Sequence, residues 1–398
     1  RLEVVESLIA LLNNGVHPVI PSQGSVGSSG DLAPLAHLAL VLIGEGMAEH
    51  EDEIISGKEA LSRANLQPLI LEEKDGLALL NGTAAMTSLA CLSLHDATVL
   101  VSHALLASAM TLDSLEGSIK PFDGRIHKAR PHPGQMKVAR GMQELLKDSG
   151  ILKGHADCSR VQDAYSLRCV PQVLGAVVDT ISFAKDVLTI EMNSATDNPL
   201  VFGKDSISGG NFHGEPVALV SDYLAIALSE VANISERRTA RLLDRRLSNL
   251  PPFLTENVGL NSGYMVAQYT AASLASENKV LAHPASVDTI PTSANQEDHV
   301  SMGTTASRKL AEIVKNTKYV VAIEMLVAVQ ALDFHQLTSS PLIEDAKRQI
   351  RDRIPSLKED REIHVDINAM TKLMDEEEIL TAGKMLSLIH ISEPTRPY

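Results

Sequence analysis

The sequence has no tryptophan, few cysteines and fewer basic than acidic residues. The three cysteines, Cys91, Cys158 and Cys169, are scattered and odd in number, which is typical of reduced thiols in a cytoplasmic protein rather than of a disulfide framework. With 35 Lys and Arg against 50 Asp and Glu, the net charge is −15, which argues against a nucleic-acid partner. No uninterrupted apolar run approaches ~18 residues, so we expect no membrane-spanning segment.

Long helical patterns dominate what is present. Apolar residues recur at helical spacing over residues 84–113, 216–247, 263–281 and 304–337. These stretches are much longer than the mean helix of ~11 residues. Val19–Ile20 and Leu200–Phe202 are the only small strand candidates. The sequence therefore predicts a mainly α protein, a bundle of long helices that forms one body over residues 1–385.

The two ends of the chain carry their own signals. The helical rhythm begins at the first residues, with Leu2, Val5 and Leu8, so we expect that an N-terminal part of the body is missing. Residues 386–398 resemble a translated sequencing adapter. We interpret that segment as a non-native tail.

A loop rich in glycine and serine gives the first chemical signal. It reads Gly24-Ser-Val-Gly-Ser28-Ser29-Gly30-Asp31. It lacks the Gly-Lys-Ser/Thr of a phosphate loop and the Gly-x-Ser-x-Gly of a nucleophile elbow, which leaves two interpretations. One is a plain turn before a helix. In the other, the Gly30 amide nitrogen attacks the Ser28 carbonyl carbon and Ser29 loses its hydroxyl as water. The product would be 4-methylidene-imidazol-5-one (MIO), an electrophile built from the chain.

Residues 24–37 resemble the signature of the MIO-dependent ammonia-lyase family. The ring-forming triplet of that family is usually Ala-Ser-Gly, and here Ser28 stands where alanine is usual. The first residue contributes mainly its carbonyl, so we expect cyclisation to occur. The resemblance implies the fold of the ammonia-lyase and fumarase/aspartase-like enzymes, and MIO as the cofactor with no external one.

Further motifs agree with this family. Asn81, at the start of a long helical run, is by itself a good helix cap, and the resemblance gives it contact with the MIO region. Gln162, Tyr165 and Arg168 are spaced by three, so on a helix they would fall on one side, which could be a plain solvated face. In the family interpretation Arg168 grips a substrate carboxylate, while Tyr165 and Gln162 orient the substrate and handle protons. Phe212 would pack beside the substrate.

The segment Gln296-Glu297-Asp298-His299 distinguishes the branches of the family. Two acids beside a histidine could suggest a metal site, but the contiguous spacing is poor for one, so we expect no metal. The segment resembles the branch that acts on histidine. A carboxylate at Glu297 can pair with an imidazole, whereas a phenyl ring offers no partner.

The resemblance implies non-oxidative deamination of L-histidine to trans-urocanate by a cytoplasmic homotetramer with shared active sites. In that family a catalytic Tyr and His lie N-terminal to the triplet, so we expect residues 1–398 alone to be inactive. The alternatives are a tyrosine or phenylalanine ammonia-lyase or aminomutase, a fumarase/aspartase-like lyase, and a non-enzymatic helical scaffold. The loop typical of the fumarase group, Gly-Ser-Ser-x-Met-Pro-x-Lys, is not found in the sequence.

Overall fold

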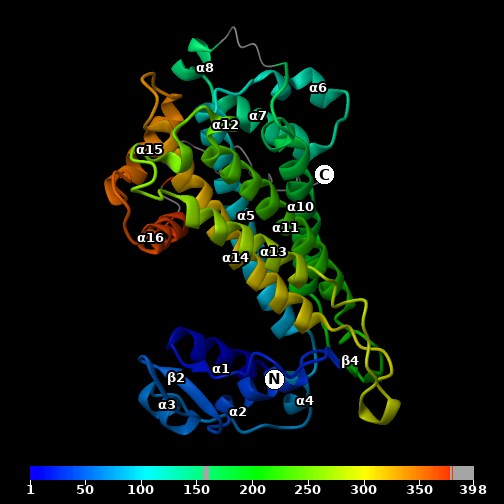
Figure 1. The fold of residues 1–398 in the computed structure, drawn as a ribbon. Coiled ribbons are helices and arrows are strands. Elements are labelled where there is room, and N and C mark those ends of the chain that lie inside the picture. The colour runs from blue at the N-terminus through cyan, green and yellow to red at the C-terminus, as the bar shows by residue number, and fades with distance from the viewer. Residues whose placement is uncertain (156–160, 377–378, 380–398) are drawn as a thin grey trace. The chain divides into compact units, whose positions relative to one another are not determined.

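The computed structural model describes residues 1–155, 161–376 and 379, and most of these lie in helices (Figure 1). Cys158 and the segment 386–398 fall outside the described residues. The chain divides into two compact units, each assembled from three separate segments. The first unit comprises 1–92, 185–222 and 284–311, and the second comprises 93–184, 223–283 and 312–398.

The first unit combines short helices with two small antiparallel sheets. Its helices are α1 (Leu2–Asn13), α2 (Leu32–Leu42), α3 (Gly57–Arg63), α4 (Asp75–Leu80) and the 3₁₀ turn η3 (Ser293–Asn295). One sheet has the strand order β1 (His17–Pro18), β2 (Met47–His50) and β3 (Glu53–Ser56), and the other pairs β4 (Leu200–Phe202) with β5 (Asp205–Ile207). Apolar side chains of α1, α2, α3 and β2 form its core, among them Leu11, Val41, Ala48 and Leu61.

Four helices are much longer than the others: α5 (Ala84–Ser114), α10 (Val170–Met192), α11 (Glu215–Leu243) and α14 (Gly303–Leu332). The greater part of each of these four helices belongs to the second unit. The remaining helices of that unit are α6 (Gly124–Lys128), α7 (Pro133–Leu145), α8 (Gly150–Gly154), α9 (Tyr165–Arg168), α12 (Arg245–Ser248), α13 (Met265–Leu281), α15 (Pro341–Arg353) and α16 (Ile363–Asp375), with 3₁₀ turns η1 (Lys120–Phe122) and η2 (Pro252–Leu254).

A buried ion pair joins the long helices of the second unit, which run side by side in Figure 1. Arg238 of α11 donates from Nε and Nη2 to the two carboxylate oxygens of Glu324 on α14, at 2.5 and 2.8 Å. Thr111 of α5 donates to the same carboxylate at 2.8 Å. Both charged side chains are completely buried. The bidentate geometry and the extra hydroxyl satisfy a charge that would otherwise be costly to bury.

The structure confirms the mainly α prediction and most of the predicted elements. The predicted helices at 84–113 and 263–281 correspond closely to α5 and α13. The stretch 216–247 is interrupted because the Asp244 carboxylate caps α12 by accepting from the Arg246 amide. The stretch 304–337 was predicted too long, since α14 ends at Leu332. The single-body interpretation of residues 1–385 stays a prediction.

The strand predictions were only partly right. Leu200–Phe202 forms β4 as expected, but Val19–Ile20 lies just after β1 rather than in a strand. The hairpin of β2 and β3 was missed. Its register pairs Met47 with Ser56, and the β3 residues are mostly exposed, so the sequence lacks a clear apolar alternation there.

Two helices of the described residues, α5 and α11, are long and apolar enough to cross a membrane by length and composition alone. Of their most apolar 18-residue windows, 56% and 67% respectively is buried inside the fold. Core helices of this length pass the same test, so the expectation of no membrane-spanning segment stays a prediction.

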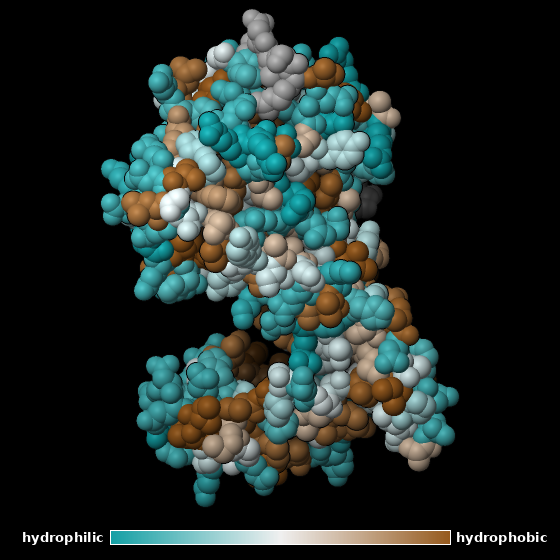
Figure 2. Space-filling view, viewed as in Figure 1, coloured by the Kyte–Doolittle hydropathy of each residue, from teal (hydrophilic) through white to brown (hydrophobic). Residues whose placement is uncertain are grey.

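Apolar side chains also reach the surface in places (Figure 2). On α1, one run of them is between 51% and 72% exposed: Leu2, Val5, Ile9 and Leu12. Contiguous exposed apolar side chains are typical of a surface that contacts another protein chain.

Candidate functional site

The Gly/Ser loop of the first unit has three residues in the left-handed backbone region, and at Gly30 only glycine fits. Gly27, Ser29 and Gly30 have φ angles of 75°, 49° and 76°. A Cβ on Gly30 would lie 1.9 Å from the carbonyl oxygen of Gly82, which no side chain can tolerate. The spacing of the glycines therefore reflects a close backbone approach as well as a turn.

The loop and the Asn81 motif form one structure, although they lie about fifty residues apart in the sequence. The Asp31 amide donates to the Gly82 carbonyl oxygen at 2.7 Å, and the Gly82 amide donates to the Ser29 carbonyl oxygen at 3.2 Å. These two bonds lie on either side of Gly30. They hold the serine-glycine pair against the turn that precedes α5.

Asp31 anchors the loop from inside the first unit. Its carboxylate is completely buried and accepts from the Met86 amide at 2.7 Å, from Ser25 Oγ at 3.1 Å and from Thr304 Oγ1. Burial raises the pKa of Asp31, while the hydrogen bonds act in the opposite direction. The loop is thereby tied to the first residues of both α5 and α14.

Glu297 lies directly against the triplet. Its Oε1 accepts from Ser29 Oγ at 3.2 Å, and its Oε2 accepts from Ser28 Oγ and from Thr292 Oγ1, the latter at 2.8 Å. The hydrogen bonds from Ser28 and then Thr292 lower the pKa of Glu297 below its ordinary value. The carboxylate is therefore ionised at neutral pH, and it lies beside the two hydroxyls of the proposed ring precursor.

Asn81 lies at the other side of the loop in a small polar network. Its side-chain amide donates to Asp197 Oδ1 at 2.9 Å and to the Asn198 carbonyl oxygen at 3.3 Å. Lys74 Nζ donates to Asp197 Oδ2 at 2.7 Å. Burial alone would raise the pKa of Asp197, but the bonds from Lys74 and Asn81 outweigh it and the pKa is lowered. The Asn81 amide orientation is thus fixed by a charged partner.

The other predicted residues lie outside this cluster. Phe212 is half-buried in the loop before α11, in the same unit as the triplet. Gln162, Tyr165 and Arg168 belong to the second unit. They do not share one helix as expected, because α9 begins at Tyr165 and Gln162 lies in the segment before it. The structure brings together Ser28, Ser29, Gly30, Glu297 and Asn81.

Two side chains of α9 have groups that are available to bind a ligand. Tyr165 is 72% exposed, and the Arg168 guanidinium carbon lies 4.7 Å from the centre of its ring. Arg168 Nε is buried and has no hydrogen-bond partner among the described residues. Gln162 and Arg168 line a pocket of about 350 Å³ in the second unit. A guanidinium that lines a pocket and has an unpartnered N–H is suited to an anionic ligand such as a carboxylate.

Three residues of the site were missed by sequence reasoning: Asp31, Thr292 and Asp197. Asp31 follows the triplet directly, and its acidic character beside an apolar helix was an available signal. Thr292 and Asp197 gave no signal, because their partners lie far away in the sequence.

Comparison with known proteins gives a consistent picture. The family model for aromatic amino acid lyases matches residues 1–352. A histidine ammonia-lyase of Caldanaerobacter subterraneus is 55% identical over 372 residues, which cover 93% of this chain and 73% of that protein.

Solved structures share the fold. The crystal structure of a histidine ammonia-lyase from Trypanosoma cruzi has a TM-score of 0.91 at 41% identity and covers 100% of this chain and 78% of that one. A tyrosine aminomutase from Streptomyces globisporus has a TM-score of 0.88 at 36% identity, covering 97% and 76%. The fold is therefore common to lyases and aminomutases, and the fold alone does not select a substrate.

Proposed function

This chain belongs to the family of aromatic amino acid lyases, and on that premise we propose that it removes ammonia from L-histidine to give trans-urocanate. It is a carbon–nitrogen lyase. The observation that carries the choice of histidine is the position of Glu297, an ionised carboxylate in contact with Ser28 and Ser29. The proteins with which the chain shares more than half of its residues are named histidine ammonia-lyases, in agreement with that choice.

The residues of the triplet fit the formation of MIO. Gly30 is held where only glycine is tolerated, so its amide nitrogen is free of a neighbouring side chain when it approaches the Ser28 carbonyl carbon. The new C–N bond releases one water, and Ser29 loses its hydroxyl as a second. The resulting methylidene is an electrophile that can accept the substrate amine and make it a better leaving group.

Loss of the Ser29 hydroxyl has a direct consequence for Glu297. The bond from Ser29 Oγ to Glu297 Oε1 exists only in the uncyclised chain, so cyclisation leaves that oxygen without this donor. Oε1 would then be free to accept a hydrogen bond from an imidazole N–H of the substrate. Ser28 and Thr292 continue to hold Oε2 in place.

An aryl substrate would leave this carboxylate unmatched. An ionised group that loses its water without gaining a hydrogen-bond donor costs several kcal/mol, roughly. The tyrosine and phenylalanine lyases or aminomutases of the same family remain the alternative, because they share the fold. Glu297 is the feature that disfavours them.

Arg168, Tyr165 and Gln162 would bind the amino acid part of the substrate. Arg168 can donate two parallel hydrogen bonds to the substrate carboxylate. Tyr165 and Gln162 orient the substrate and hold or transfer protons. The supporting observations are the exposed ring of Tyr165 and the unpartnered Arg168 Nε. Asn81 and Phe212 complete the binding site, one by hydrogen bonding and one by packing.

The triplet and Glu297 lie in the first unit, whereas the α9 side chains lie in the second. A homotetramer with shared active sites would bring them together between subunits. In this arrangement the α9 side chains of one subunit complete the triplet of another, and apolar surfaces such as the exposed face of α1 are covered. We place the protein in the cytoplasm, in agreement with its free thiols Cys91 and Cys169, and expect neither nucleic acid nor membrane as a partner.

The test is product formation by the complete polypeptide. L-histidine, L-tyrosine and L-phenylalanine are supplied in parallel, and urocanate is followed by its ultraviolet absorbance. The proposal predicts urocanate from histidine and no cinnamate or coumarate from the other two. Product from the aryl amino acids alone would agree with the proposed MIO electrophile but would refute the assignment of histidine as the substrate.

A further inference from the structure

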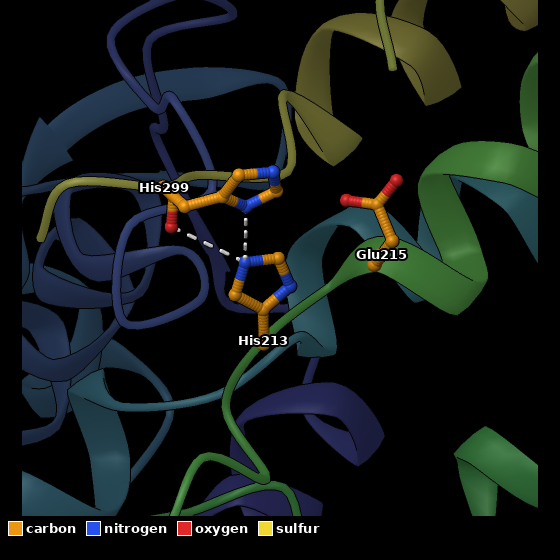
Figure 3. A group of neighbouring side chains, drawn as sticks. All are labelled: His213, Glu215 and His299. Carbon is orange, nitrogen blue, oxygen red and sulfur yellow. Dashed lines mark hydrogen bonds between the residues drawn. The ribbon is translucent and has the colours of Figure 1, made fainter. Parts of the chain in front are cut away.

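Three side chains that have no role in the proposed deamination converge in the first unit (Figure 3). His213 lies in the loop before α11, Glu215 is the first residue of α11, and His299 lies on the segment before α14. One nitrogen of each imidazole and one oxygen of the carboxylate lie within 4.8 Å of one another. Two imidazoles and a carboxylate are a common ligand set for divalent transition metals.

The two imidazoles already have the spacing of ligands on one ion. His213 Nε2 and His299 Nδ1 are 3.4 Å apart, and the two rings are stacked with centroids 5.4 Å apart. Bonds of ~2.0–2.1 Å at a tetrahedral angle place two nitrogens roughly 3.3–3.4 Å apart, whereas a right angle gives about 2.9 Å. The observed separation therefore agrees with tetrahedral coordination.

Glu215 supplies the negative charge. It lies in the first turn of α11, where the helix dipole favours the ionised carboxylate. Its oxygen can be as far as 4.8 Å from the nitrogens, so its side chain must turn inward to coordinate the same ion. Because a carboxylate side chain rotates easily at a half-exposed position, this adjustment is small.

The backbone that carries these side chains is well held. The His213 amide donates to the Gly210 carbonyl oxygen at 2.9 Å, and the Val300 amide donates to Thr289 Oγ1 at 2.9 Å. Gly214 is buried so closely that a Cβ there would lie 2.4 Å from Met86 Sδ. The three ligands thus project from fixed backbone, and His299 is exposed enough to admit an ion from solvent.

We propose that His213, Glu215 and His299 bind one divalent transition-metal ion of the zinc type, with water as the fourth ligand. In the free site His213 Nε2 contacts the His299 carbonyl oxygen at 3.3 Å and must carry a proton to donate to it. On binding, that proton moves to Nδ1 and the Nε2 lone pair faces the ion. The bound ion joins the start of α11 to the segment that carries Glu297.

This site was not expected from the sequence, where only the contiguous Glu297-Asp298-His299 segment was considered. In the structure the carboxylate near His299 is that of Glu215 rather than Glu297 or Asp298. The second imidazole is that of His213, which lies 86 residues before His299. The proposal does not depend on the proposed deamination, because metal binding is measured without substrate.

The experiment is equilibrium dialysis of the complete polypeptide against Zn²⁺, with Co²⁺ as a visible probe of geometry. The wild type is expected to bind one ion per chain at these residues, and Co²⁺ to show a tetrahedral spectrum without sulfur charge transfer. His299→Gln and Glu215→Gln should each weaken binding by more than the roughly 10–100-fold that loss of a second-shell partner costs. Circular dichroism establishes that each variant is folded.

Two matched variants serve as controls. Asp298→Asn removes the exposed acid next to His299, and His364→Gln removes an exposed histidine of α16; both should bind Zn²⁺ like the wild type. Undiminished binding in His299→Gln and Glu215→Gln would refute the site. So would the absence of stoichiometric binding in the wild type, or a cobalt spectrum with thiolate charge transfer that persists in every variant.

Discussion

At the scale of single residues, the site depends on close contacts that few other residue types could make. Gly30 touches the Gly82 backbone, and Glu297 accepts from both Ser28 and Ser29. The first contact positions the amide that would close the ring. The second places a carboxylate where the electrophile would form.

Gly30→Ala should abolish the chemistry. Its Cβ would meet the Gly82 carbonyl oxygen at 1.9 Å, at a φ of 76° that alanine disfavours. Intact-mass measurement should show that the wild type has lost two waters and that the variant has lost none. Gly209→Ala, where nothing lies within 4 Å of the added Cβ, should lose two waters as the wild type does. A cyclised Gly30→Ala chain would contradict the account.

The hydroxyl of Ser28, which the alanine usual at this position would lack, should affect how enzyme activity depends on pH. Its hydroxyl is the largest cause of the lowered pKa of Glu297. Since the ionised carboxylate must accept from imidazole, activity falls as the pH drops through that pKa. In Ser28→Ala the pKa rises, so the acid limb of the kcat/KM profile should move to higher pH. An unchanged limb would show that Ser28 does not tune Glu297.

Much of the site could be predicted from the sequence, because the triplet, Asn81 and Glu297 lie in recognisable motifs. What could not be predicted is which of these meet. Thr292 supports Glu297 and Asp197 orients Asn81 through contacts between distant segments. Single-sequence patterns report local periodicity and composition and carry no information about such pairings.

At the scale of elements, the long helices were predictable for a clear physical reason. Apolar spacing repeated over eight or more turns in α5 and α14 leaves no other regular structure. The errors occurred where a short polar feature overrides that pattern. The Asp244 cap interrupts a continuous stretch, and the short hairpin of β2 and β3, whose β3 residues are mostly exposed, gives almost no periodic signal.

The ion pair between α11 and α14 should be important for stability. Glu324→Gln leaves Arg238 buried with a neutral partner, which should cost about 3–5 kcal/mol of unfolding free energy. Glu59→Gln, which removes a largely exposed partner of Arg63 on α3, should change it by less than about 0.5 kcal/mol. Urea denaturation of both variants provides the comparison. Equal and small effects would show that the buried pair is not a structural determinant.

At the scale of the whole molecule, the residues proposed to act together are divided between the two structural units. Ser28, Ser29 and Glu297 lie in the first unit, while Tyr165 and Arg168 lie in the second. The homotetramer proposed above would let them meet between subunits. It would also cover exposed apolar side chains such as those of α1.

Shared sites predict complementation between inactive variants. Ser29→Ala removes the electrophile and Arg168→Ala removes the carboxylate grip, so each alone should be nearly inactive. Co-expressed in one cell, they should form mixed tetramers in which some sites have both intact groups, and partial activity should return. Light scattering establishes the tetramer. Mixed tetramers without activity, or an active monomer, would contradict shared sites.

The most direct test of the whole account is the rate of urocanate formation from L-histidine by Glu297→Gln. The variant keeps the triplet and should still lose two waters, but it replaces a charged acceptor with a neutral amide. Loss of one charge-assisted hydrogen bond predicts a fall in kcat/KM of roughly 10- to 100-fold. A Glu297→Gln enzyme that deaminates histidine as fast as the wild type would contradict the assignment of substrate to this site.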